Sequence, residues 1–121
     1  MVKKRRSTRV ACNEKVVFQY DGIFIEAKLL NISLIGALVQ LNEDMSMQIG
    51  DQCRITIYLN ILGITLHFST EVRHSLNNQV GVEFLFLDSD SKIYLKSLLD
   101  FRTANPHLIS EEFDFSLHHN E

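Results

Sequence analysis

A chain of 121 residues, 45% of them hydrophobic, is long enough for one compact domain with a core and too short for two. Its apolar runs span only a few residues, so we expect no transmembrane helix, no secretory signal and a cytoplasmic location. Cys12 and Cys53 match no metal-binding or disulfide pattern, and we expect two reduced thiols.

Charge is distributed unevenly along the chain. The first nine residues hold five of the 12 basic residues and no acidic one, so they carry +5, whereas the remaining 7 basic and 15 acidic residues sum to -8. A protein that binds nucleic-acid polymers is expected to be basic over a whole face. We therefore predict that residues 1–15 form a flexible basic arm that suits a small anion better than a polyanion.

Hydrophobic residues alternate with polar residues from about residue 16 to residue 86. This period of two predicts six strands joined by short turns, among them Asp21-Gly22 and Asn77-Asn78. With no helix between the strands, parallel α/β folds are excluded and an antiparallel barrel or sandwich is favoured. The predicted strands cover residues 16–20, 23–31, 36–41, 53–59, 64–72 and 80–86, and the last has an inward row of Val80, Val82, Phe84 and Phe86.

A helix is predicted after the sixth strand. Residues 88–91 offer N-cap side chains, and apolar residues then recur at helical spacing until Asn105-Pro106. This apolar stripe can dock over an open end of a barrel. It consists of Tyr94, Leu95, Leu98, Leu99 and Phe101. Residues 106–121 form an acidic tail with interspersed apolar residues, which is either disordered or a second docking segment.

Three short segments together resemble a known family. Arg5-Arg6-Ser7-Thr8-Arg9 fits RxxxR, Asn31-Ile32-Ser33-Leu34-Ile35-Gly36 fits (D/N)xSxxG, and Val80-Gly81-Val82-Glu83-Phe84 fits a Gly-Val-x-Phe strand. In this order and spacing they resemble PilZ domains, the bacterial receptors for cyclic di-GMP. The resemblance implies a mainly β fold, a six-stranded antiparallel split barrel with a C-terminal α-helix over residues 16–105.

The resemblance also implies a ligand site. Arginine's planar fork can bond the adjacent O6 and N7 of guanine, bond phosphate, or stack on a purine. Asn31 replaces the commoner Asp of the family, and one amide oxygen accepts fewer bonds than a carboxylate, which predicts weaker binding. The implied contacts are Arg5 and Arg9 to guanine and phosphate, Arg6 as a further donor, and Asn31 and Ser33 at the guanine. Gly36 is implied where the backbone must turn or approach closely, and Lys4 and Gly81 are additional candidates.

Three functions are compatible with these features. The first is a cyclic di-GMP receptor that orders its arm on binding and contacts a downstream protein, without cofactor. The second is a degenerate PilZ module that acts only through protein contacts, in pilus or motility machinery. The third, nonspecific nucleic-acid binding, is disfavoured by the acidic body. We expect no enzyme and no metal site, because no Ser or Cys has a recognisable base partner and the histidines lack metal-ligand spacing.

Overall fold

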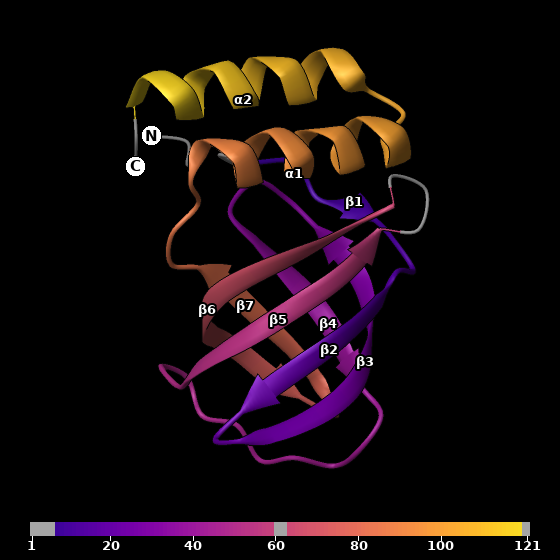
Figure 1. Ribbon diagram of the computed structural model, residues 1–121, viewed down its shortest axis with the longest axis vertical. Coiled ribbons are helices and arrows are strands. Elements are labelled where there is room, and N and C mark those ends of the chain that lie inside the picture. Colours follow the sequence, from indigo (N-terminus) through magenta and orange to yellow (C-terminus); the bar gives the residue numbers. More distant parts are fainter. Residues whose placement is uncertain (1–6, 60–62, 120–121) are drawn as a thin grey trace.

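The computed structural model describes residues 7–59 and 63–119, which form a β-barrel covered at one end by two helices (Figure 1). The six barrel strands are β2 (Lys15–Tyr20), β3 (Ile23–Ile32), β4 (Gly36–Leu41), β5 (Gln52–Leu59), β6 (Ile64–Leu76) and β7 (Gln79–Phe84). They pair antiparallel in the order β3-β2-β5-β6-β7-β4, and β4 returns to β3 to close the barrel. The predicted six-stranded antiparallel barrel is confirmed.

The alternation seen in the sequence becomes the inside and the outside of the barrel. Phe18 on β2 and Ile55 on β5 are register partners and are completely buried, whereas the flanking Gln19 and Arg54 pair on the outer face. At the predicted β2–β3 hairpin turn, Asp21 and Gly22 have φ of 54° and 80°. These values match the type I′ turn, which suits the twist of an antiparallel pair.

Helix α1 (Ser89–Arg102) lies across one end of the barrel, and α2 (Pro106–His119) packs on its outer side (Figure 1). The Asp88 side chain accepts the Ser91 amide at 2.7 Å and caps α1. The two helices bury apolar side chains at helical spacing, namely Leu95, Leu98 and Leu99 from α1 and Ile109 and Phe113 from α2. Within residues 7–59 and 63–119, no helix has the length and apolar character needed to cross a membrane.

The α1 region differs from the prediction in two ways. Tyr94 and Phe101 are exposed, because only the narrower leucine stripe faces the barrel and α2. The helix also ends earlier than expected, at Arg102. The next residue, Thr103, has extended backbone angles, and its N–H donates to the Leu99 carbonyl. Pro106 does not stop α1 but begins α2, since proline suits the first helical position, where no backbone N–H is needed.

The inward row predicted for the sixth strand is one residue too long. β7 ends at Phe84, and the following Leu85 amide still bonds the Ser69 carbonyl at 2.9 Å. The chain then leaves the sheet toward the α1 cap, so Phe86 is 73% exposed and the prediction that it faces inward is wrong.

A seventh strand lies inside the segment predicted as an arm. β1 (Val10–Ala11) pairs antiparallel with the end of β3, and Val10 is buried. Residues 1–6 lie outside the described residues, while residues 7–15 lie against the barrel and the helices. Flexibility of the arm over residues 1–15 stays a prediction.

Candidate functional site

The pairing of β1 with β3 brings the two predicted motifs together. Ala11 is the register partner of Asn31, and Val10 that of Ile32. One residue before β1, Arg9 donates from Nη1 to Asn31 Oδ1 at 2.7 Å on the exposed side of the sheet. The last arginine of RxxxR and the first residue of NxSxxG, 22 positions apart, are therefore in direct contact.

Ser33 shapes the turn that follows β3. Its side chain is completely buried, and its hydroxyl accepts the amides of Ile35 at 3.0 Å and Gly36 at 3.2 Å. The Ser33 amide in turn donates to the Gly36 carbonyl at 2.9 Å. A serine hydroxyl suits such a turn because it can accept from the backbone two and three residues ahead. The predicted contact of Ser33 with guanine stays a prediction beside this structural role.

Gly36 lies where β4 begins close to β7. It is the register partner of Glu83, and a Cβ on Gly36 would collide with the carbonyl oxygen of Val82 and lie 3.2 Å from the Glu83 Cα. Both neighbours are backbone atoms of a paired strand and cannot turn aside. The glycine of the motif is therefore needed for the approach of two strands.

Gly81 belongs to the same cross-strand row as Asn31. Asn31 pairs with Leu38 on β4, Leu38 with Gly81 on β7, and Gly81 with His74 on β6. With strands about 4.8 Å apart, Gly81 lies roughly 10 Å from Asn31 across the outer face. Since Gly81 has no side chain, the outer face of the barrel has a shallow depression between the side chains of Leu38 and His74.

The other predicted basic residues, Lys4, Arg5 and Arg6, lie outside the described residues. Of the predicted ligand-contacting residues, the structure thus places Arg9, Asn31, Ser33, Gly36 and Gly81. Arg9 and Asn31 touch, Ser33 and Gly36 share the adjoining turn, and Gly81 lies two strands away.

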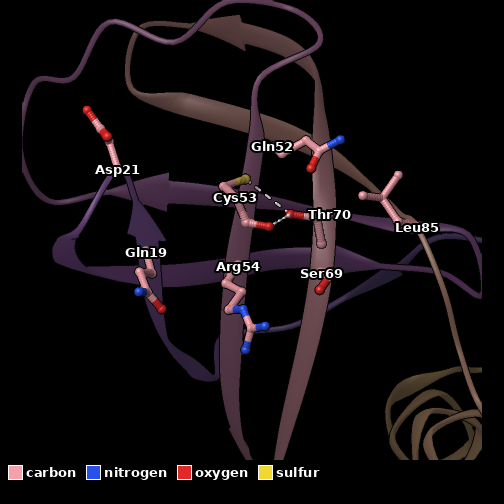
Figure 2. A pocket seen from close by; sticks show the side chains of 8 residues that line it. All are labelled: Gln19, Asp21, Gln52, Cys53, Arg54, Ser69, Thr70 and Leu85. Carbon is pink, nitrogen blue, oxygen red and sulfur yellow. Dashed lines mark hydrogen bonds between the residues drawn. The ribbon is translucent and has the colours of Figure 1, made fainter.

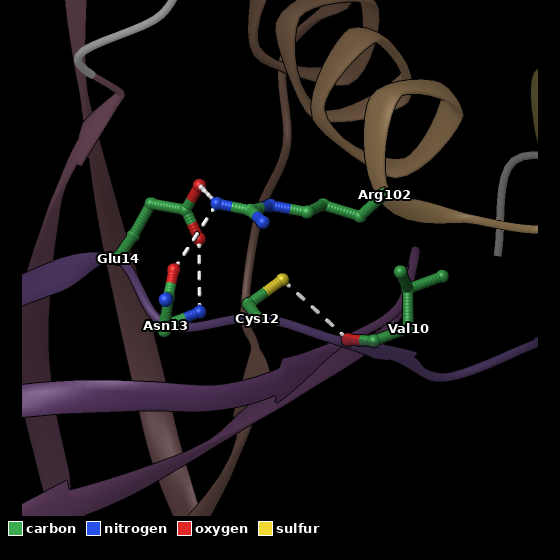
Figure 3. A network of polar contacts seen from close by, with 5 residues as sticks. All are labelled: Val10, Cys12, Asn13, Glu14 and Arg102. Atoms are coloured by element: carbon green, nitrogen blue, oxygen red, sulfur yellow. Dashed lines mark hydrogen bonds and ion pairs between the residues drawn. The ribbon is translucent and has the colours of Figure 1, made fainter.

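A polar network that the sequence did not reveal holds the β1–β2 connection against α1 (Figure 3). Arg102 Nη2, near the end of α1, donates to Glu14 Oε2 at 2.8 Å and to Asn13 Oδ1 at 3.1 Å. The hydrogen bond to Glu14 raises the pKa of Arg102, so the guanidinium stays charged. No local pattern predicts this contact, because its partners are 88 residues apart in sequence.

The thiol of Cys12 lies beside this network (Figure 3). Its Sγ lies 3.5 Å from the Val10 carbonyl, which it can reach as a weak donor. Burial raises the pKa of Cys12 to about 12, and the negative charge of Glu14 adds to the effect. The thiol is therefore protonated at neutral pH and is a poor nucleophile.

A second polar contact links the arm to α2. Glu112 accepts the Thr8 amide through Oε1 at 2.8 Å and the Thr8 hydroxyl through Oε2 at 2.6 Å. Thr8 occupies one of the unspecified positions of RxxxR, so the motif does not predict its contact with Glu112. Because the partners are 104 positions apart in sequence, only the fold reveals the contact.

A hollow lined by none of the motif residues lies around the start of β5 (Figure 2). It has a volume of about 290 Å³, and its floor includes Cys53 and Thr70, whose side chains lie 3.1 Å apart. Burial raises the pKa of the Cys53 thiol, which leaves it protonated as well. Among residues 7–59 and 63–119, no three His, Cys, Asp or Glu side chains are grouped to hold a metal ion.

Comparison with known proteins identifies relatives of this fold. The sequence model of the PilZ domain matches residues 3–101. The PilZ domain of YcgR from Escherichia coli, solved with c-di-GMP, superposes with a TM-score of 0.67 at 15% identity and covers 98% of this chain and 99% of that one. The PilZ domain of CeSA from a cellulose-synthesizing bacterium gives 0.64 at 15% identity, with coverages of 76% and 94%.

A third solved structure, the inhibitor of motility MotI/DgrA from Bacillus subtilis, gives a TM-score of 0.65 at 18% identity. It covers 98% of this chain, but this chain spans only 53% of that protein. A search of curated proteins finds no match. At such low identities the structural likenesses establish the fold.

Proposed function

The chain belongs to the PilZ domain family, and we propose from this premise that it is a receptor for cyclic di-GMP. The ligand would bind where the basic arm meets the outer face of β3. The observation that carries the proposal is the 2.7 Å contact of Arg9 with Asn31, which joins the two motif halves at an exposed place. Neither the fold nor either motif alone supports the proposal as strongly.

The chemistry of the two side chains fits the ligand. Cyclic di-GMP offers two phosphodiester charges and two guanines, each with O6 and N7 as adjacent acceptors. The Arg9 guanidinium can donate two hydrogen bonds to O6 and N7, and the Asn31 side-chain amide can hydrogen-bond the Watson–Crick edge of guanine. Without ligand these two side chains bond each other, and a hydrogen bond with one charged partner contributes about 1.5–3 kcal/mol. The ligand must therefore offset the loss of this contact, and its phosphate and guanine groups can do so by bonding both side chains.

The surface beside Asn31 suits a flat base. We propose that a guanine lies over the depression at Gly81, between the side chains of Leu38 and His74, its register partners on the two neighbouring strands. Lys4, Arg5 and Arg6 would then close over the phosphates from the arm. Five positive charges in the first nine residues outweigh the two charges of one ligand, so a stacked pair of ligands is also compatible with the arm.

Signalling in this proposal passes through the arm. Ligand would order the basic residues over the barrel and change the surface offered to a downstream protein. Both cysteines are free thiols, which is typical of the reducing cytoplasm, and we place the receptor there.

Asn31 itself favours a second candidate function, a protein-interaction module without useful affinity for the nucleotide. An amide has one acceptor oxygen and no charge, whereas the family's commoner aspartate can accept two charge-assisted bonds from guanine. In this alternative the barrel surface would bind its partner whether or not cyclic di-GMP is present.

Calorimetric titration of the full chain with cyclic di-GMP tests the receptor proposal. We expect saturable binding that weakens at least about tenfold in Arg9→Ala, because a charge-assisted contact is lost. Arg54→Ala is the matched control, since Arg54 is an exposed arginine on β5 beside the distant hollow. Absence of binding would favour the interaction module, and equal binding of unrelated oligonucleotides with steep salt dependence would indicate a nucleic-acid binder.

A further inference from the structure

We propose that Glu112 of α2 is a positioning residue for the ligand, holding the arm so that Arg9 faces Asn31. This inference rests on the proposed function, because it concerns the same site. It adds a residue outside both motifs and outside residues 3–101, which the PilZ sequence model matches.

The contact between Glu112 and Thr8 uses both carboxylate oxygens. One accepts the Thr8 backbone amide at 2.8 Å, and the other accepts the Thr8 hydroxyl at 2.6 Å. A side chain that bonds both the backbone and the side chain of one residue restricts its position and its rotation. Hydrogen bonds to a charged acceptor are also stronger than those between neutral groups.

Glu112 is itself held by a packed helix. The adjacent Phe113 and Ile109, one turn earlier, are buried in the core cluster that also contains the buried leucines of α1. The ammonium of Lys96 on α1 lies 5.8 Å from the centre of the Phe113 ring. The carboxylate therefore presents its oxygens from a fixed element rather than from a loop.

Fixing Thr8 also orients Arg9. Ser7 and Val10, on either side of the pair, are buried, so residues 7–10 lie between α2 and β3. Thr8 bonds α2, and the next side chain, Arg9, bonds Asn31 on β3. The segment is thus held from both sides, one residue apart. A basic arm held in this way loses less conformational entropy when the ligand binds, and preorganisation of this kind strengthens binding.

Coupling between the arm and α2 must act in both directions. If docking of α2 improves ligand affinity, then ligand binding stabilises the docking of α2 by the same free energy. The stability of α2 docking therefore reports whether the ligand is bound.

The test compares affinities for cyclic di-GMP in the full chain. Glu112→Ala removes both bonds and should weaken binding about fivefold or more, a typical size for coupled sites. Glu112→Gln should restore most of it, since its amide oxygen can accept the Thr8 amide and its NH₂ can donate to the Thr8 hydroxyl. Glu111→Ala is the control, because Glu111 is exposed on the same helix and pairs with His107 at 3.0 Å.

Hydrogen exchange of α2 separates positioning from general stability. Ligand should slow exchange of the α2 amides in the wild type and should not do so in Glu112→Ala. Thr8→Val, a change in the arm that leaves the core intact, should weaken binding less than Glu112→Ala because only the hydroxyl bond is lost.

Unchanged or tighter binding in Glu112→Ala, with the wild type binding normally, would overturn the positioning role alone. A wild type that binds no cyclic di-GMP would overturn the proposed function and this inference together. If Glu112→Ala fails to fold, Thr8→Val decides, and wild-type affinity in that variant would refute the role of the contact.

Discussion

Replacing Gly36 with alanine tests whether the motif glycine serves the barrel itself. The new methyl group would collide with the Val82 carbonyl and lie 3.2 Å from the Glu83 Cα, so the β4–β7 pair would have to move apart. Overpacking against side chains typically costs about 1–3 kcal/mol, and two backbone atoms cannot relax by rotation. We therefore expect a loss of at least about 3 kcal/mol in the free energy of unfolding.

Gly81→Ala is the matched control for this substitution. Its methyl group would meet the His74 Cβ at 3.2 Å and a Leu38 methyl at 3.9 Å, both of which belong to side chains on the outer face. Small shifts can relieve this contact, and alanine is favoured over glycine in a strand by about 0.5–1 kcal/mol, so we expect little net change. The assay is urea unfolding followed by circular dichroism. Equal midpoints for the two variants would refute the close approach at Gly36.

Three further predictions concern the site and its surroundings. Ser33→Ala should lower the free energy of unfolding by about 1–3 kcal/mol, measured by urea unfolding, because two turn amides lose their acceptor; wild-type stability would contradict the turn role. Asn31→Asp should tighten cyclic di-GMP binding in calorimetry by several-fold, and weaker binding would mean that the new carboxylate prefers Arg9 to the ligand. With a pKa raised to about 12, the Cys12 thiol should react with iodoacetamide at pH 8 at least about a hundredfold more slowly than free cysteine. The Cys12 thiol of the unfolded chain loses its proton near pH 9, whereas the folded state keeps that proton up to about pH 12. The contribution of Cys12 to the free energy of unfolding is therefore fully present at neutral pH and is lost as pH rises from about 9 through 12. A Cys12→Ala variant should therefore show a shallower alkaline loss of stability, and an unchanged slope would contradict the raised pKa.

Strands and turns could be predicted because each depends on neighbouring residues. Alternation places one set of side chains in the barrel whatever the partner strand is, as Phe18 and Ile55 show. Likewise, Asn77 and Asn78 adopt φ of 54° and 66°, values that asparagine tolerates better than most residues. These features follow from local chemistry.

What the sequence concealed depends on contacts between distant segments. β1 has only two residues and gains its identity from pairing with β3. Helix α2 needs α1 to bury Ile109 and Phe113, so its mixed composition alone left disorder as an alternative. The Thr8–Glu112 contact spans 104 positions, and neither residue belongs to the conspicuous part of a motif.

The outer and inner parts of the NxSxxG segment also could not be separated from the sequence. The motif presents Asn31, Ser33 and Gly36 as equivalent candidates for the ligand. In the structure, Asn31 faces Arg9 on the surface, whereas Ser33 and Gly36 are buried in the turn. Their burial depends on the pairing of β4 with β7, a contact between distant segments that local sequence does not specify.

Nuclear magnetic resonance titration with cyclic di-GMP tests the central claim most directly, because it reports where the ligand binds. We predict saturable shifts of the Arg9 backbone amide and the Asn31 side-chain amide, at the place where the two motifs meet. Signals of Arg54 and Ser69, at the distant hollow, should not move. Shifts confined to that hollow, or no shift of Arg9 and Asn31 at saturating ligand, would contradict the account.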